Sequence, residues 1–222
     1  MQATQPASAP SKAAASLAAT DQRDSSERRA PLPDRAAVIG VDPGLGGALV
    51  RVTRLGETGA FDLDHQHRTP ILKEGRGRSH YDESECVEIV LEMMCGVDVI
   101  AFAVEDLVAA PRVFQIGAEG DVEHGKFSHG SNGAFRLGYG VGLWIGIAKA
   151  CKLPVVRVRP QAWQASTLVG LPRGPQVKVS AARRARDLYP TLRLASKKDW
   201  GMADAALIAT HVLRGFEGNR RS

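Results

Sequence analysis

The sequence predicts an α/β fold with a mixed five-stranded sheet flanked by helices. Its first folded part holds three strand patterns joined by short glycine turns, which is typical of an antiparallel meander. Further along, apolar strand patterns alternate with helical patterns, and this alternation favours parallel strands. The 222 residues, of which 44% are hydrophobic, suit one domain of moderate size with a substantial core.

Residues 1 to 35 precede this domain and are rich in Ala, Ser, Pro and Gln. Such a composition buries too little apolar surface to order itself. The first twenty residues are Ser- and Ala-rich and free of acids, as in an organelle transit peptide, but Lys12 is their sole basic residue. A transit peptide and a plain disordered tail are both open. We expect the folded domain at residues 36 to 216 and a tail at 217 to 222.

The first elements of the domain are three strands and a helix. Strands are expected at residues 37 to 41, 48 to 53 and 59 to 63, where apolar or β-branched segments are bounded by Gly or Pro. Residues 82 to 95 carry apolar side chains at helical spacing opposite a face rich in acids. This pattern predicts an amphipathic helix.

The remaining elements alternate between strand and helix. A wholly apolar strand is expected at residues 99 to 104, a long helix at 132 to 152 and a fifth strand at 153 to 158. Two helices, at about 176 to 188 and 201 to 214, end the domain. The order of elements therefore predicts the meander followed by parallel strands.

Two of the apolar strands end in a carboxylate. Asp42 follows the first strand and Glu105 follows the strand at 99 to 104. Parallel strands end at the same edge of a sheet, so these two acids can face each other if their strands are neighbours. Ligand sites in open α/β sheets form at such strand ends. The alternative for Asp42 is an Asx-turn, in which it hydrogen-bonds only its own Pro-Gly turn.

Two further acids lie near the C-terminus. Asp204 opens a helix of small apolar residues, so its face packs close to the sheet and the acid needs a counterion. The alternative for Asp204 is a salt bridge to Lys197 or Lys198. Asp199 lies five residues earlier, about 140° round a continuous helix, and can join Asp204 only from the turn before the helix. Its alternative is an ordinary helix N-cap.

Carboxylates gathered without His or Cys favour Mg²⁺ or Mn²⁺ over Zn²⁺. Two such ions about 4 Å apart can activate a water and stabilise the leaving oxygen in phosphodiester hydrolysis. On this interpretation the catalytic and metal-binding residues are Asp42, Glu105, Asp199 and Asp204. The Gly-Leu-Gly-Gly turn after Asp42 would let a metal and a phosphate backbone approach.

The charge distribution suggests an anionic polymer as partner. From Lys149 to the end, 15 Lys and Arg stand against 4 Asp and Glu, a net +11 in a chain whose total is +5. A merely solvated basic surface is the alternative. No membrane association is expected, because the longest apolar stretch, residues 137 to 150, is too short to cross a bilayer. Three cysteines without metal-type spacing fit a reducing compartment.

These residues carry a family resemblance over about residues 37 to 214. The strand with Asp42, the strand ending in Glu105 and the helix with Ala203-Asp204-Ala205 resemble the ribonuclease H superfamily, specifically the Holliday junction resolvases of the RuvC type. The segments 138 to 146, 158 to 163 and 197 to 204 resemble the chloroplast ("monokaryotic chloroplast") branch of plants and algae.

The resemblance implies a ribonuclease H-like fold and symmetric, metal-dependent nicking of four-way DNA junctions by a homodimer, here in the chloroplast nucleoid. It also implies that Asp42, Glu105, Asp199 and Asp204 are the catalytic acids. Gly201 stands where many members carry an acid or His. The family inserts an aromatic residue near the junction centre, and Phe114 and Phe127 are the candidates here.

Other groups are candidates for DNA contact. They are Lys73, Arg76 and Arg78 in a glycine-containing loop, and Lys197 and Lys198 before the last helix. For the loop, a solvated surface segment is the alternative. Gly138, Gly142 and Gly146 form one helix stripe, which suits close packing on the sheet or across a dimer axis, with core packing preferred. Trp163 is interpreted as a packing anchor, and His211 lies too far along its helix to join the acids.

Two other functions remain open beside junction resolution. One is another ribonuclease H-like nuclease acting on RNA–DNA hybrids, and the other is a non-catalytic module that binds branched DNA. Actin-like ATPases and sugar kinases also begin with a strand, an Asp and a glycine turn. They need two such domains, which 222 residues cannot supply.

Overall fold

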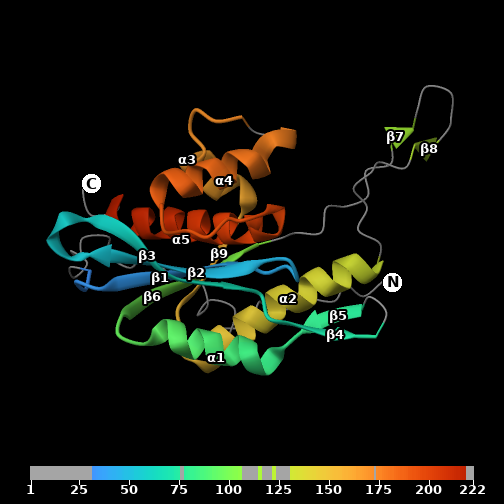
Figure 1. Ribbon diagram of the computed structural model, residues 1–222, viewed down its shortest axis with the longest axis horizontal. Coiled ribbons are helices and arrows are strands. Elements are labelled where there is room, and N and C mark those ends of the chain that lie inside the picture. The colour runs from blue at the N-terminus through green and yellow to red at the C-terminus, as the bar shows by residue number, and fades with distance from the viewer. Residues whose placement is uncertain are drawn as a thin grey trace, which may run out of the picture. The chain divides into compact units, whose positions relative to one another are not determined.

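The central feature of the computed structural model is one five-stranded mixed sheet with strand order β3-β2-β1-β6-β9 (Figure 1). The structure describes residues 32–75, 78–106, 115–116, 122–123, 131–172 and 174–218. β1 (Ala36–Asp42), β2 (Ala48–Leu55) and β3 (Ala60–Arg68) form an antiparallel meander. β6 (Asp98–Glu105) lies parallel to β1, and β9 (Val155–Val158) parallel to β6. The predicted mixed sheet is confirmed.

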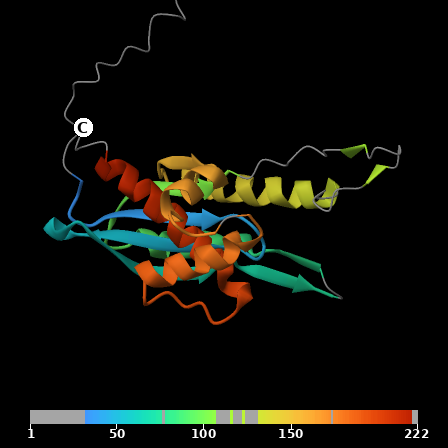
Figure 2. The ribbon, with the colours of Figure 1, turned by 90° about the horizontal axis from the view of Figure 1, so that it is seen from above.

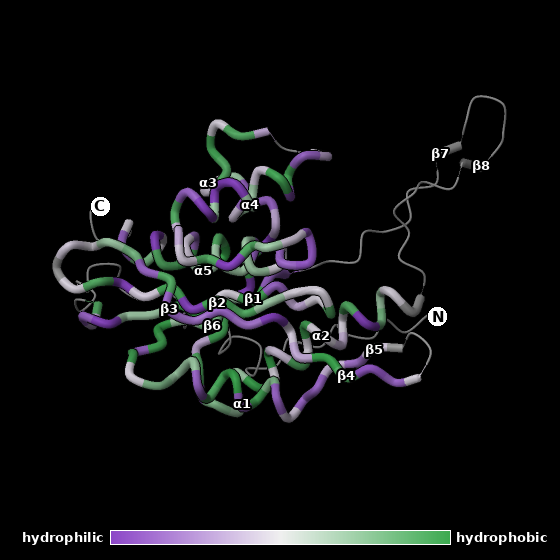
Figure 3. The backbone as a smooth tube through the Cα atoms, viewed as in Figure 1, coloured by the Kyte–Doolittle hydropathy of each residue, from purple (hydrophilic) through white to green (hydrophobic). Residues whose placement is uncertain are grey.

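Helices cover both faces of this sheet. On one face lie α3 (Pro160–Thr167), α4 (Val177–Leu188) and α5 (Trp200–Gly218); on the other lie α1 (Glu83–Met94) and α2 (Ser131–Ala150) (Figure 1). Alternate residues of each strand point to opposite faces. Val38 accordingly packs in the apolar cluster under α5, while Ile39 and Val41 pack in the cluster under α1 and α2. In Figure 3 green hydrophobic and purple hydrophilic stretches alternate along the chain, and much of β3 is purple.

α5 packs unusually close to β1 because residue 40 is glycine. A Cβ at Gly40 would overlap the carbonyl oxygen of Ala205 and lie 2.8 Å from the amide nitrogen of Ala209. From Gly201 to Thr210 every residue of α5 is buried. The small residues in this helix therefore set its distance from the sheet, and with it the position of Asp204.

Several elements differ from the expectations. β3 continues to Arg68, and the expected basic loop is a hairpin of β4 (Ile71–Glu74) and β5 (Arg78–Tyr81). A short helix, α3, follows β9, and α5 runs on to Gly218. The compact unit that contains the sheet begins at Leu32.

The minor elements are short. They are η1 (Gly56–Thr58), η2 (Gly174–Gln176), η3 (Lys197–Asp199) and the two-residue strands β7 (Gln115–Ile116) and β8 (Val122–Glu123). Phe114, Phe127 and Arg76 lie outside the described residues. Within the described ranges, no helix combines the length and apolar character that a bilayer crossing requires.

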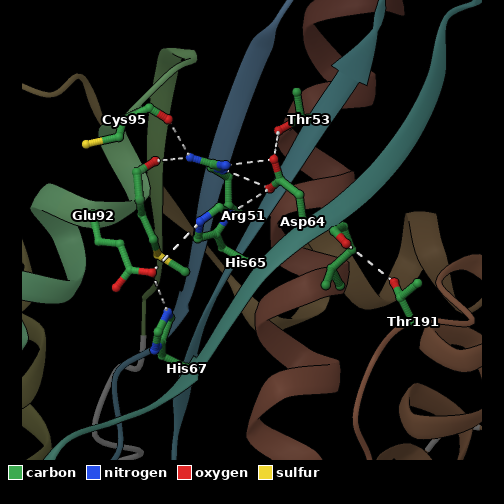
Figure 4. A network of polar contacts seen from close by, with 10 residues as sticks. Arg51, Thr53, Asp64, His65, His67, Glu92, Cys95 and Thr191 are labelled. Atoms are coloured by element: carbon green, nitrogen blue, oxygen red, sulfur yellow. Dashed lines mark hydrogen bonds and ion pairs between the residues drawn. The ribbon is translucent and has the colours of Figure 1, made fainter.

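A buried ion pair fixes α1 to the sheet (Figure 4). Arg51, 2% exposed, donates from Nε and Nη2 to the two carboxylate oxygens of Asp64 at 2.8 and 2.7 Å. Its Nη1 donates to the carbonyl oxygens of Met93 and Cys95, at 2.7 and 3.1 Å. Burial would raise the pKa of Asp64, but these bonds from Arg51 outweigh it and lower the pKa. The pair therefore also caps the C-terminal end of α1, where carbonyls lack helical partners.

Candidate active site

The strand registers place the acids in one row at an edge of the sheet. Asp42, the last residue of β1, pairs with Ala48, and Ala48 pairs with Arg68 on β3. On the other side of β1, the parallel register brings Glu105 to the position beside Asp42. Glu105 in turn pairs with Val158 of β9. The row therefore runs from Arg68 through Asp42 to Glu105.

In the glycine-containing turn after Asp42, neighbouring backbone leaves no room for a side chain at position 47. A Cβ at Gly47 would overlap the carbonyl oxygen of Asp42, and one at Gly201 would lie 2.8 Å from the carbonyl oxygen of Gly46. The Gly44 amide donates a hydrogen bond to Asp42 Oδ1 at a distance of 3.5 Å. The Asx-turn contact is therefore present but long. The start of α5 thus packs directly on this turn, which explains glycine at 201.

Asp204 reaches the row from α5 and is 1% exposed. Its Oδ2 accepts a hydrogen bond and ion pair from Nζ of Lys178 on α4, whose side chain is 50% exposed. The salt bridge considered for Asp204 therefore exists, but with Lys178 in place of Lys197 or Lys198. Asp204 Oδ1 is buried and has no hydrogen-bond partner among the described residues.

Glu105 is held by a tryptophan. The indole Nε1 of Trp163 donates to Glu105 Oε1 at 2.8 Å, and both side chains are buried. Trp163 also packs in the apolar cluster under α5, so it is a packing anchor, as expected, and a hydrogen-bond donor to the candidate site as well. This bond fixes one oxygen, and Oε2 makes no hydrogen bond to the described residues.

The carboxylates carry more negative charge than their surroundings compensate. Burial raises the pKa of Asp42, of Glu105 to about 7 and of Asp204 to about 6. The charge of Lys178 opposes the increase in all three pKa values. The charge of Asp42 adds to the increase for Glu105 and Asp204. Burial alone would lower the pKa of Lys178, but the three acids raise it. One ammonium group therefore serves three carboxylates.

The residues present fit a divalent cation. The donors are all carboxylate oxygens, which suit Mg²⁺ or Mn²⁺, and the unpartnered Asp204 Oδ1 is an unused ligand atom in a buried position. Across the described ranges, no three His, Cys, Asp or Glu side chains are arranged as a ready metal site. Lys178 and Trp163 each engage one oxygen of a carboxylate in the row and leave the other oxygen free of their contact.

Asp199 lies in the turn before α5, the position from which it could share a metal with Asp204. Its carboxylate oxygens, however, bind other groups. Oδ1 accepts hydrogen bonds from Nε and Nη2 of Arg68, the former at 2.8 Å. Oδ2 accepts from the amide of Ser196 at 2.8 Å and completes a capping box. Burial would raise the pKa of Asp199, but Arg68 and Ser196 lower it. The N-cap is therefore Ser196, and Asp199 is the third residue of its capping box and the partner of Arg68.

The remaining candidate residues are distributed around this row. Lys73 is exposed on β4, and Arg78 begins β5. Lys197 and Lys198 are exposed in η3, with Nζ of Lys197 5.8 Å from the centre of the Trp200 ring. His211 does not contact the acids; its Nδ1 forms a hydrogen bond with Oγ of Ser166 at 2.6 Å.

The glycine stripe of α2 does not pack against the described part of the chain. A Cβ at Gly138, Gly142 or Gly146 would meet no described atom within 4 Å, so the preferred expectation of core packing is wrong. Nearby, Phe135 and Tyr139 are 73% and 43% exposed. The N-terminal end of α2 extends past the ends of the strands of the five-stranded sheet, on the side of the β4–β5 hairpin (Figure 2).

A cavity lies beside the row of acids. This cavity of about 590 Å³ is formed by the β4–β5 hairpin, the start of α1 and α2, and includes Leu45 from the turn after Asp42. The carboxylates of the row do not line it. The row of acids and this cavity are therefore neighbours that share only the glycine turn.

Sequence reasoning missed Lys178 and the Glu105 contact of Trp163. Lys178 lies 26 residues from Asp204, in a helix with several other basic residues. No spacing rule singles out one lysine in such a helix. A tryptophan donates from a single group, so burial favours a nearby acceptor, as at Trp163 but not at Trp144, whose Nε1 has no partner among the described residues.

Comparisons with known proteins establish the fold. No family model matches the chain, and no curated protein matches its sequence. The structure of Thermus thermophilus RuvC is 22% identical over 82% of this chain and 97% of its own, with a TM-score of 0.53. T. thermophilus RuvC in complex with a Holliday junction substrate is 20% identical over 83% and 97%, with a TM-score of 0.51. The ribonuclease H-like fold is thereby confirmed.

Proposed function

We propose that this chain is a metal-dependent endonuclease that resolves four-way DNA junctions. The observation that carries the proposal is the row of Asp42, Glu105 and Asp204, which has too little positive charge and an unused carboxylate oxygen. The fold supports it, because one structure with this fold was solved with a Holliday junction substrate. The basic charge of the C-terminal part suits a DNA partner.

Each residue of the row has a proposed role. Asp42, Glu105 and Asp204 would hold Mg²⁺ or Mn²⁺, which when bound supplies an activated water and stabilises the leaving oxygen. Trp163 keeps one Glu105 oxygen fixed, so the other oxygen has a defined direction. Lys178 reduces the repulsion among the carboxylates. The glycine turn leaves Asp42 open to a phosphate. In this assignment Asp199 belongs to the capping box of Ser196 and pairs with Arg68, and it is not a ligand.

The active form would be a homodimer. Symmetric cuts on both sides of a branch point require two sites related by a two-fold axis. The exposed glycine stripe of α2, with Phe135 and Tyr139 beside it, offers an apolar face for a second copy. Closeness to the chloroplast branch and location in the chloroplast nucleoid are also proposed, from the quoted motifs and the composition of residues 1 to 35. Import of a fluorescent fusion into isolated chloroplasts tests the location.

One incubation tests the activity. Labelled four-way junction, linear duplex of the same sequence and RNA–DNA hybrid are mixed with the protein in Mg²⁺, Mn²⁺ or EDTA. Paired nicks near the branch point, with either metal and not with EDTA, support the proposal. Degradation of the hybrid with the junction intact would assign a ribonuclease H activity. Tight junction binding without any cleavage would indicate the non-catalytic module.

A further inference from the structure

Arg68 ends β3 in line with the row of acids. Two register pairs, Asp42 with Ala48 and Ala48 with Arg68, place it two strands from Asp42. Neighbouring strands lie about 4.8 Å apart, so the two Cα atoms are about 10 Å apart. Residues directly paired in a sheet project to the same face. Arg68 therefore stands on the α5 side, beside the candidate site.

The guanidinium of Arg68 is held in place yet open to solvent. Its side chain is 55% exposed, while that of its partner Asp199 is 3% exposed. Nε and Nη2 both donate to Asp199 Oδ1, and Ser196 holds Oδ2. Among the described residues, Nη1 makes no hydrogen bond to the chain. An arginine fixed in this way has already lost much of the side-chain freedom that binding would otherwise cost.

Folding alone gives little reason for this arrangement. Ion pairs with a half-exposed partner contribute little to stability. Ser196 and Asp199 complete the capping box of η3 without Arg68. Lys197 and Lys198, both exposed, lie on the same short element as Asp199 and extend the positive charge at this edge.

We infer that Arg68, positioned by Asp199, binds a phosphate of the cleaved DNA strand beside the candidate metal site. The inference rests on the proposed function. The offset of about 10 Å across two strand spacings places the contacted phosphate near the scissile one without coinciding with it. Arginine suits this task because its planar fork leaves donors free while others are engaged. Asp199 is then a positioning residue, whose carboxylate serves DNA binding through Arg68.

Salt-dependent binding of a labelled four-way junction, in EDTA so that no cleavage occurs, tests the inference. One phosphate contact contributes about 0.9 to the slope of log affinity against log salt. Raising the salt from about 50 to about 200 mM weakens junction binding by some factor in the wild type. In Arg68→Ala that factor should be about 3.5 times smaller. Arg54→Ala is the matched control, since Arg54 pairs with Glu217 at 3.2 Å towards the other end of β2. It should retain the wild-type slope.

Asp199→Asn separates positioning from metal binding. The amide keeps an oxygen for Ser196 but removes the charge that holds Arg68. Asp199→Asn should lower junction affinity and leave Mn²⁺ binding, measured by calorimetry, unchanged. The double variant should bind junctions no worse than Arg68→Ala, because both changes act on the same contact.

Three results would overturn the inference. The first is a wild-type slope in Arg68→Ala. The second is additive loss in the double variant. The third is loss of Mn²⁺ binding and cleavage in Asp199→Asn with an unchanged slope, which would make Asp199 a metal ligand. In all three the wild type still cuts junctions, so the proposed function stands. A wild type that neither binds nor cuts junctions refutes both.

Discussion

Replacing Glu105 by Gln should remove a pH-dependent loss of stability that the metal-free protein carries. The pKa of Glu105 is raised from its ordinary value of 4.5 to about 7 in the folded chain, chiefly by burial. The folded state therefore favours the protonated acid. This contribution to stability is fully present below pH 4.5 and is lost as the pH rises through 7. The glutamine side chain would keep an acceptor for Trp163 and would not titrate.

The size of the loss follows from the two pKa values. The two pKa values of Glu105 differ by about 2.5 pKa units. At about 1.36 kcal/mol for each pKa unit, this difference corresponds to about 3 kcal/mol of stability in total. About 2.5 kcal/mol of this falls between pH 5 and pH 8. For a chain of this size, the loss corresponds to a fall in Tm of about 5 to 10 °C.

Urea unfolding in EDTA at pH 5, 6, 7 and 8 measures the effect, with wild type and Glu105→Gln compared at each pH. EDTA is needed because a bound cation would favour the ionised acid. Glu88→Gln, a change on the exposed face of α1, controls for loss of a surface carboxylate. The reasoning is refuted if the free energy of unfolding of wild type and Glu105→Gln changes equally, within 1 kcal/mol, across this pH range.

Three further predictions address the site, the packing and the assembly. Asp42→Asn should abolish nicking and spare junction affinity, since phosphate contacts carry binding and the metal carries the chemistry; equal loss of both in gel-shift and cleavage assays would contradict this. Gly40→Ala should destabilise the protein by about 1 to 3 kcal/mol, because the new methyl group overlaps the carbonyl of Ala205; a variant as stable as wild type in urea would show that α5 can shift. The protein should sediment as a dimer and Gly142→Arg as a monomer, whereas a monomeric wild type with and without junction DNA would argue against α2 as the contact.

Most of the sheet could be predicted from the sequence because its strands are short, apolar and bounded by turn residues. β1 and β6 were clear for this reason, and the placement of Asp42 beside Glu105 followed from parallel strand ends. The end of β3 was not predicted. Polar residues at the end of this strand contact groups on both faces of the sheet: His65 and His67 lie near Glu92, and Gln66 bonds to Thr191. The sequence therefore shows no alternation of apolar and polar residues that would reveal the strand.

The candidate site could be predicted only where backbone geometry determined it. Asp42, Glu105 and Asp204 come from elements whose order fixes their positions. Lys178 and Arg68 join through long side chains from elements far along the chain, and no local pattern records such contacts. Asp199 shows the same limit, because its spacing from Asp204 suited a shared ion, while its actual partner lies 131 residues away.

The close seat of α5 on β1 also determines how the protein can move. Asp204 lies in the stretch of α5 that is buried throughout, and Gly40 leaves no layer of side chains between that stretch and the strand. A helix packed in this way cannot unfold locally while the core stays folded. Its backbone amide hydrogens should therefore exchange with solvent only through global unfolding. The candidate site then has no separate melting step. Thermal inactivation and loss of tertiary structure should share one midpoint, and substrate must enter a preformed centre.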